Sequence, residues 1–169
     1  MCEDRVVIEV VVRKYTDHLP LYRQSEAFLR DAGLDLSRKT LMGWVMRSGE
    51  LLRPVNAAIF AEVAATGYMQ VDESPVPVSD PSIPGANGRG WWWTYSCPHG
   101  SVSYDFAQTR GYDAAVERLK NYQGKLQTDG YAVYDKFHHQ GLIHLGSWSH
   151  ARRPFHQLAT VHKVDPPKS

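Results

Sequence analysis

The fold is decided by residues 68–78, which read YMQVDESPVPV. Apolar residues at mostly alternating positions are typical of a β-strand, and here they are Met69, Val71, Val76 and Val78. Asp72 lies inside this pattern, although strand interiors disfavour aspartate. Because a carboxylate buried without a partner is costly, Asp72 predicts a metal-binding or hydrogen-bonding role.

Downstream of this strand, turn signals and apolar patterns alternate and predict a mixed sheet. Residues 79–90 are rich in Pro, Gly, Ser and Asn, which predicts a loop. Residues 91–95 and 102–106 are β-prone on either side of a Pro-His-Gly turn, which predicts a hairpin. A helix, a strand, a short helix and a strand are then expected at residues 112–122, 125–129, 132–138 and 142–148. The element order βββαβαβ indicates the α+β or α/β class.

The chain before residue 67 is helical in character. Pro20 favours a helix start directly after it, and Gly33 fits a helix C-cap. Ser37 fits the N-cap of the next helix, which is expected to be bent or interrupted at Pro54. The helices are expected at residues 5–15, 21–31 and 39–66. We therefore divide the chain into a helical segment, residues 1–66, and a sheet domain, residues 67–169.

Two of these helices, joined by a short turn that contains glycine, are similar to a helix-turn-helix. Arg38, Lys39 and Arg47 on the second of them could contact DNA phosphates. A helical hairpin with a solvated basic face is the alternative.

A second carboxylate, Asp129, lies at the end of the strand predicted at residues 125–129. A hairpin followed by a crossover helix can bring the first and fourth strands side by side, so that Asp72 and Asp129 share divalent cations. Such an arrangement is what metal-dependent phosphoryl transfer needs. Asp129-Gly130 could also be a simple turn. Alternation points Glu73 to the opposite face from Asp72, so a structural or supporting role is expected for Glu73.

Two further groups of side chains have a functional and a structural interpretation. His150, Arg152 and Arg153 begin the expected last helix and are candidate DNA-binding residues, with the arginines suited to binding phosphates. A solvated helix face is the alternative. Trp91, Trp92 and Trp93 could stack on bases, but consecutive aromatics on a strand are expected mainly to serve the core.

Composition allows a soluble globular chain and excludes few functions. The formal net charge of +1 gives no overall basic field that would indicate a nucleic-acid partner. Cys2 and Cys97 form no disulfide framework, and no basic leader followed by a continuous apolar run begins the chain. No stretch is apolar enough to span a bilayer. A cytoplasmic protein without a membrane partner is therefore expected.

Four stretches carry a resemblance to the transposases of insertion-sequence family 66, and their order and spacing cover most of the chain. They are YTDHLPLYRQ at residues 15–24, DESPVPV at residues 72–78, QTDGYAVY at residues 127–134 and WSHARRPF at residues 148–155.

The resemblance implies a DDE-type transposase core with an RNase H-like fold. Such a core acts on the double-stranded DNA of transposon ends with Mg²⁺ or Mn²⁺. Asp72 and Asp129 match the first and second acidic residues, and both would be catalytic residues and metal ligands. The resemblance also supports the DNA-binding interpretation of the helical segment; assembly into a homo-oligomer is left open.

Two departures from the family pattern bear on activity. Family members usually have Cys at the position of Ser147, and their third acidic residue lies on a helix beyond residues 148–155. Asp165 lies too close to that segment to replace it. We therefore expect a chain truncated at both ends. An inactive remnant that binds only DNA or partner subunits is the main alternative, and a different RNase H-like nuclease is a weaker one.

Overall fold

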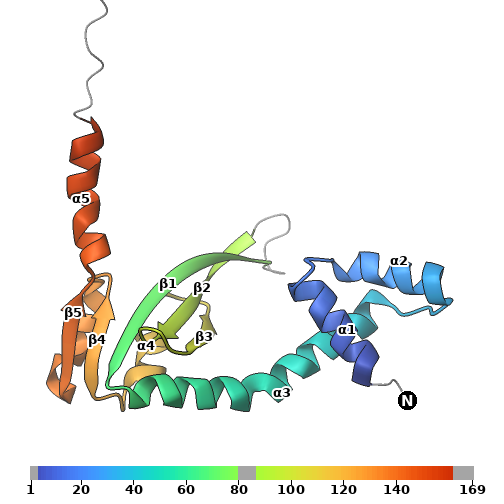
Figure 1. Cartoon of the computed structure of the whole chain (residues 1–169), viewed down its shortest axis with the longest axis horizontal. Coiled ribbons are helices and arrows are strands. Elements are labelled where there is room, and N and C mark those ends of the chain that lie inside the picture. Colours follow the sequence, from blue (N-terminus) through green and yellow to red (C-terminus); the bar gives the residue numbers. More distant parts are fainter. Residues whose placement is uncertain (1–3, 80–86, 162–169) are drawn as a thin grey trace, which may run out of the picture. The chain divides into compact units, whose positions relative to one another are not determined.

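The computed structural model describes residues 4–79 and 87–161, and it divides the chain into two compact units, residues 1–55 and 56–169. The long helix α3 (Arg38–Ala65) belongs partly to each unit. We describe the units separately (Figure 1). Within the described residues, no helix is both long and apolar enough to cross a membrane.

The first unit consists of α1 (Asp4–Tyr15), α2 (Leu21–Ala32) and the first part of α3. Its small core contains Val10, Leu21, Leu41 and Val45. Gly33 ends α2 in a left-handed conformation with φ 65°, and Ser37 Oγ accepts the backbone N–H of Thr40 at 3.1 Å. The predicted helices and both caps are therefore confirmed. The expected interruption is wrong in that α3 continues through Pro54 as one helix.

The second unit is built on a five-stranded mixed sheet in the order β3-β2-β1-β4-β5. Antiparallel pairs join β1 to β2 and β2 to β3, whereas β4 is parallel to both β1 and β5. The prediction that the first and fourth strands are neighbours is confirmed, as is the α+β class. The strands are β1 (Tyr68–Ser79), β2 (Asn87–Ser96), β3 (Val102–Ala107), β4 (Gly124–Thr128) and β5 (Leu142–Gly146).

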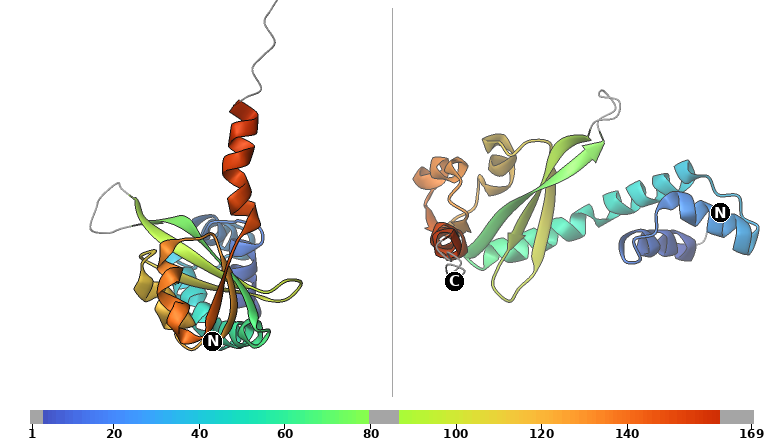
Figure 2. Two further views of the ribbon diagram at one scale, coloured as in Figure 1. Left: turned by 90° about the vertical axis from the view of Figure 1, so that its left-hand side faces the viewer. Right: turned by 90° about the horizontal axis from the view of Figure 1, so that it is seen from above.

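The loop prediction for residues 79–90 is wrong where the structure can test it. Ser79 still belongs to β1, and residues 87–90 belong to β2 and pair with β1 up to Ser79↔Asn87 (Figure 2, right). Cross-strand pairing thus outweighs the turn propensity of this glycine-rich stretch, and the ring of Phe106 lies over Gly90, where a larger side chain would collide with it. Residues 80–86 lie outside the described residues.

Three helical elements alternate with the later strands, α4 (Tyr112–Leu119), the 3₁₀ helix η1 (Ala132–Gln140) and α5 (Trp148–Val161). The helix expected at 112–122 ends earlier, and the short helix expected at 132–138 is of the tighter 3₁₀ type. The strand expected at 142–148 stops at Gly146, because the Ser147 carbonyl already accepts the backbone N–H groups of His150 and Ala151 and so starts α5.

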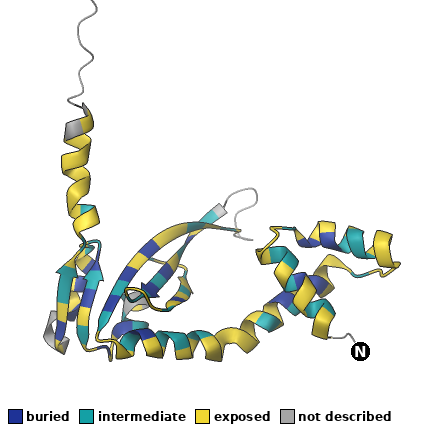
Figure 3. Ribbon diagram, in the orientation of Figure 1, coloured by how far each residue is buried: buried dark blue, intermediate teal, exposed yellow. Residues whose placement is uncertain are grey.

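The core of the second unit lies on one face of the sheet and contains Met69, Val71, Trp93, Tyr95 and Leu126. Buried and more exposed residues alternate along the first half of β1 (Figure 3). Helical residues that pack against it include Leu119, Tyr134 and Phe137. Trp93 is 1% exposed, as the core interpretation predicts, whereas Trp92 is 45% exposed and contacts Phe106 with ring centroids 5.7 Å apart. Consecutive tryptophans therefore point to opposite faces of the sheet, Trp93 into the core and Trp92 to the exposed face.

Candidate metal centre

The carboxylates of Asp72 and Asp129 come together because β1 and β4 run parallel. Gln70 is paired with Gln127 in the register of these strands, and each aspartate follows two residues later. The Gln127 Oε1 atom accepts hydrogen bonds from Gln70 Nε2 and from the Tyr68 hydroxyl, both at 2.7 Å, which ties the strands together just before the aspartates. The pairing of Gln70 with Gln127 therefore places Asp72 and Asp129 near each other, each two residues further along its chain segment.

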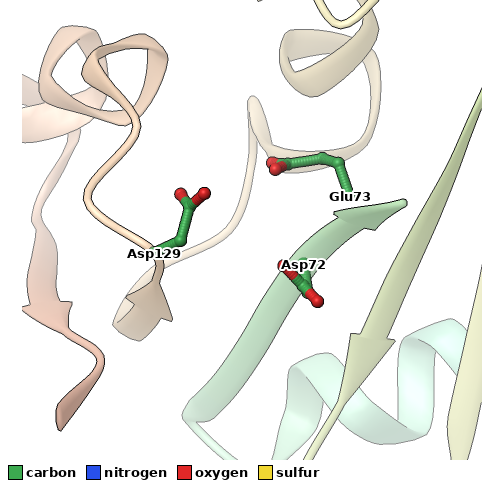
Figure 4. Close-up of side chains that lie close together, drawn as sticks. All are labelled: Asp72, Glu73 and Asp129. Atoms are coloured by element: carbon green, nitrogen blue, oxygen red, sulfur yellow. The ribbon is translucent and has the colours of Figure 1, made fainter. Parts of the chain in front are cut away.

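Glu73 joins these two aspartates in a group of three acidic side chains, each of which offers an oxygen within 4.8 Å of the others (Figure 4). The three carboxylates nevertheless differ in burial, since Asp72 is exposed, Asp129 is partly exposed and Glu73 is buried. Their roles are therefore distinguished by what each of them contacts.

Asp72 points to the open face of the sheet. Within the part of the chain that the structure describes, its carboxylate makes no hydrogen bond or ion pair. It borders a hollow of about 140 Å³ whose lining residues are mostly polar. The hollow is lined by Gln70, Val71, Asp72, Thr94, Ser96, Gln127, Thr128, Asp129, Ser147 and His150. Asp72 is thus free to hold a cation.

Asp129 is held by two protein donors. Its Oδ1 atom accepts the backbone N–H of Tyr131 at 2.9 Å, and its Oδ2 atom accepts Arg110 Nη2 at 2.9 Å. Gly130 follows in a left-handed conformation with φ 83°, so the predicted Asp129-Gly130 turn is present. The turn and a ligand role are compatible, because a carboxylate has about four lone-pair positions and only two are used here.

Glu73 lies on the buried face, as alternation along the strand predicts, and its side chain is 1% exposed. The Tyr134 hydroxyl donates to Oε1, and Arg110 Nη2 donates to Oε2 at 3.1 Å. Burial raises the pKa of Glu73, while the hydrogen bonds from Tyr134 and Arg110 partly offset this effect. Glu73 is therefore occupied by protein donors.

Arg110 is the residue of this site that sequence reasoning missed. It lies between β3 and α4, bridges Glu73 and Asp129, and stacks on the rings of Tyr131 and Trp91 at 4.1 and 5.3 Å. Burial lowers the pKa of Arg110, but the hydrogen bonds and charges of Glu73 and Asp129 outweigh it, so the net pKa is raised. Nothing in its local sequence marks it, because both partners are distant along the chain.

The residues expected to bind DNA fall into two places. Arg38, Lys39 and Arg47 are exposed on α3 in the first unit. In the second unit, Arg152 and Arg153 are exposed on α5. His150 differs from them because it is partly buried and lines the hollow beside Asp72 and Asp129.

The donor set of the hollow fits a hard divalent cation. Mg²⁺ and Mn²⁺ prefer oxygen ligands, and Asp72 and Asp129 offer carboxylate oxygens with unused lone pairs on neighbouring strands. Arg110 compensates the charges of Glu73 and Asp129 but does not contact Asp72 within the described residues. These two aspartates are therefore the residues that could hold the metal.

Comparison with known proteins assigns the chain to a class. The model of the Transposase IS66 family, a DDE-type family, matches residues 1–168, so the chain belongs to this family. Divalent metal use is what the family implies, and the structure contains an acidic group that could hold such an ion.

The relatives that match along most of the chain come from Sinorhizobium fredii (strain NBRC 101917 / NGR234). Uncharacterized protein y4qI is 31% identical over 171 residues, which cover 92% of this chain and 31% of the relative. Uncharacterized protein y4jD is 29% identical over 170 residues, which cover 92% of this chain and 33% of the relative. The chain thus spans about a third of the length of these relatives. No solved structure matches it significantly.

The buried hydrogen bond between Tyr134 and Glu73 leads to a stability prediction. Tyr134→Phe removes a donor from a carboxylate that has no access to water, which costs about 1–3 kcal/mol. We expect urea unfolding to show a free energy of unfolding lower by this amount. The matched control is Tyr104→Phe, because Tyr104 is 53% exposed; its change should stay within about 0.5 kcal/mol. Equal stability of both variants would show that the Tyr134 hydroxyl does not stabilise Glu73.

Proposed function

We propose that the chain forms part of the catalytic core of a transposase that cleaves and joins DNA at transposon ends. Asp72 and Asp129 are its first and second acidic residues, and the core is RNase H-like. The observation that carries this proposal is that Asp72 and Asp129 each lie two residues beyond Gln70↔Gln127, the last pair of the parallel strands β1 and β4. Their carboxylate oxygens lie within 4.8 Å of each other beside a polar hollow. Membership of the transposase family supports it.

The chemistry assigned to this site is transfer of a phosphoryl group of the DNA backbone. A bound Mg²⁺ or Mn²⁺ supplies Lewis acidity toward the phosphoryl oxygen and a more acidic bound water. Asp72 and Asp129 hold the cation. Thr94, Ser147 and His150 line the same hollow and supply hydrogen-bonding groups that can orient a DNA phosphate.

A third acidic residue completes the site in the DDE pattern, and the resemblance places it beyond residues 148–155. Within the described residues, Asp72 and Asp129 are the carboxylates that line the hollow, and Glu73 is occupied on the buried face.

Cleavage of labelled transposon-end DNA in Mg²⁺ or Mn²⁺ tests the catalytic assignment. We expect Asp72→Asn and Asp129→Asn to reduce cleavage to the level of buffer, because each removes a charged cation ligand. Asp113→Asn is the matched control, because Asp113 is exposed on α4 outside the hollow, and it should cleave as the unchanged protein does.

Other outcomes separate the alternatives. If the unchanged chain and both variants cleave no more than buffer but retain DNA binding, the chain is a DNA-binding module only. If the unchanged chain cleaves and either aspartate variant cleaves equally well, the assignment of that aspartate is wrong.

We propose that Arg38, Lys39 and Arg47 on α3, and Arg152 and Arg153 on α5, bind DNA phosphates. Replacing the three α3 cations by Gln should weaken binding similarly for all DNA sequences. The slope of log affinity against log salt should become shallower by about 0.9 for each phosphate that the variant no longer neutralises. Arg30→Gln is the control, because Arg30 is already paired with Asp31 at 2.6 Å. An unchanged salt slope in the triple variant would contradict a phosphate-binding role for α3.

A further inference from the structure

Arg110 is more restrained than a surface arginine near an acidic group would be. A single nitrogen, Nη2, donates to both Glu73 and Asp129, and the guanidinium lies 4.1 Å from the centre of the Tyr131 ring. Its side chain is 30% exposed. Hydrogen bonds from one side and ring stacking from another leave the guanidinium little freedom to move.

Glu73 is what fixes Arg110 to the core. Its carboxylate is buried and also accepts the Tyr134 hydroxyl, and Tyr134 itself is fully buried. A buried carboxylate needs a cationic partner, so Glu73 holds Arg110 in place. The chain of contacts therefore runs from the core through Tyr134, Glu73 and Arg110 to Asp129.

At the end of this chain, both oxygens of Asp129 are restrained. Arg110 engages Oδ2, and the Tyr131 N–H engages Oδ1, so the plane of the carboxylate is defined from both sides. Asp72 has no comparable support within the described residues. Of the two aspartates, Asp129 is therefore the one whose carboxylate is held in a fixed orientation by the protein.

We propose that Arg110 is a positioning residue, which Glu73 and Tyr131 hold in place so that it orients the Asp129 carboxylate for cation binding beside Asp72. Glu73 supports Arg110 and is not itself a cation ligand. This inference rests on the proposed function, because it takes Asp72 and Asp129 as the metal-holding pair. Hydrogen-bonded partners of metal ligands commonly change metal affinity by about 10- to 100-fold when they are removed.

A purely electrostatic role for Arg110 predicts the opposite sign. Removing a positive charge next to Asp129 would strengthen the binding of a divalent cation, because like charges repel. A purely structural role predicts reduced stability with unchanged affinity. The direction in which metal affinity changes therefore separates these three roles.

The test measures Mn²⁺ binding to the full chain by titration calorimetry, with free Mn²⁺ followed by electron paramagnetic resonance. We expect Arg110→Gln to weaken Mn²⁺ binding about 10-fold or more, and Arg110→Lys to recover part of that affinity. Tyr131→Leu removes the stacking ring without changing charge and keeps the backbone N–H. It should weaken binding several-fold, whereas an electrostatic role predicts no change.

Arg118→Gln is the matched control. Arg118 is 28% exposed, pairs with Asp105 and lies over the Phe60 ring, so its replacement breaks a similar set of interactions away from the hollow. It should lower the unfolding temperature but leave Mn²⁺ affinity unchanged. Circular dichroism melts of all variants show which of them are folded at the titration temperature, and Tyr131→Leu keeps the test open if Arg110→Gln does not fold.

Asp72→Asn separates failure of this inference from failure of the proposed function. If Asp72→Asn binds Mn²⁺ as tightly as the unchanged chain, or if the unchanged chain binds none, the metal pair and the role of Arg110 are both overturned. If Asp72→Asn abolishes binding while Arg110→Gln and Tyr131→Leu bind as tightly as the unchanged chain or more tightly, the metal pair stands and the positioning role is overturned.

Discussion

Parallel pairing of β1 with β4 is the constraint on which the site depends. The register brings Gln70 beside Gln127, and both strands then deliver an aspartate at the same level. Parallel strands need a crossover connection, which here contains α4, and that connection also carries Arg110 to the site. The parallel pairing of β1 with β4 thus positions Asp72 and Asp129, and the crossover connection that it requires contains Arg110, which binds Asp129.

The period of two along β1 gives adjacent acidic residues different environments. Asp72 faces the open side of the sheet, whereas Glu73 faces the core, where charge must be compensated. Arg110 and Tyr134 provide this compensation, and Arg110 extends it to Asp129. The arginine that compensates the buried charge of Glu73 therefore also restrains the carboxylate of Asp129.

Local sequence predicts the parts of this arrangement that depend on strand alternation and order. The inward direction of Glu73 follows from its neighbour Asp72, and the adjacency of β1 and β4 follows from the order of elements. Arg110 could not be found in this way, because its partners are fixed by tertiary structure. The extension of β2 to Asn87 escaped prediction for the same reason: pairing with β1 overrides a glycine-rich sequence.

The most direct test of the central claim is anomalous diffraction from crystals of the chain soaked in Mn²⁺. We expect a peak on the open side of the sheet, about 2.0–2.3 Å from one carboxylate oxygen of Asp72 and one of Asp129, with Arg110 still bound to Glu73. A peak coordinated by Glu73 with Arg110 displaced, or a Mn²⁺ ion bound away from both aspartates, would contradict it.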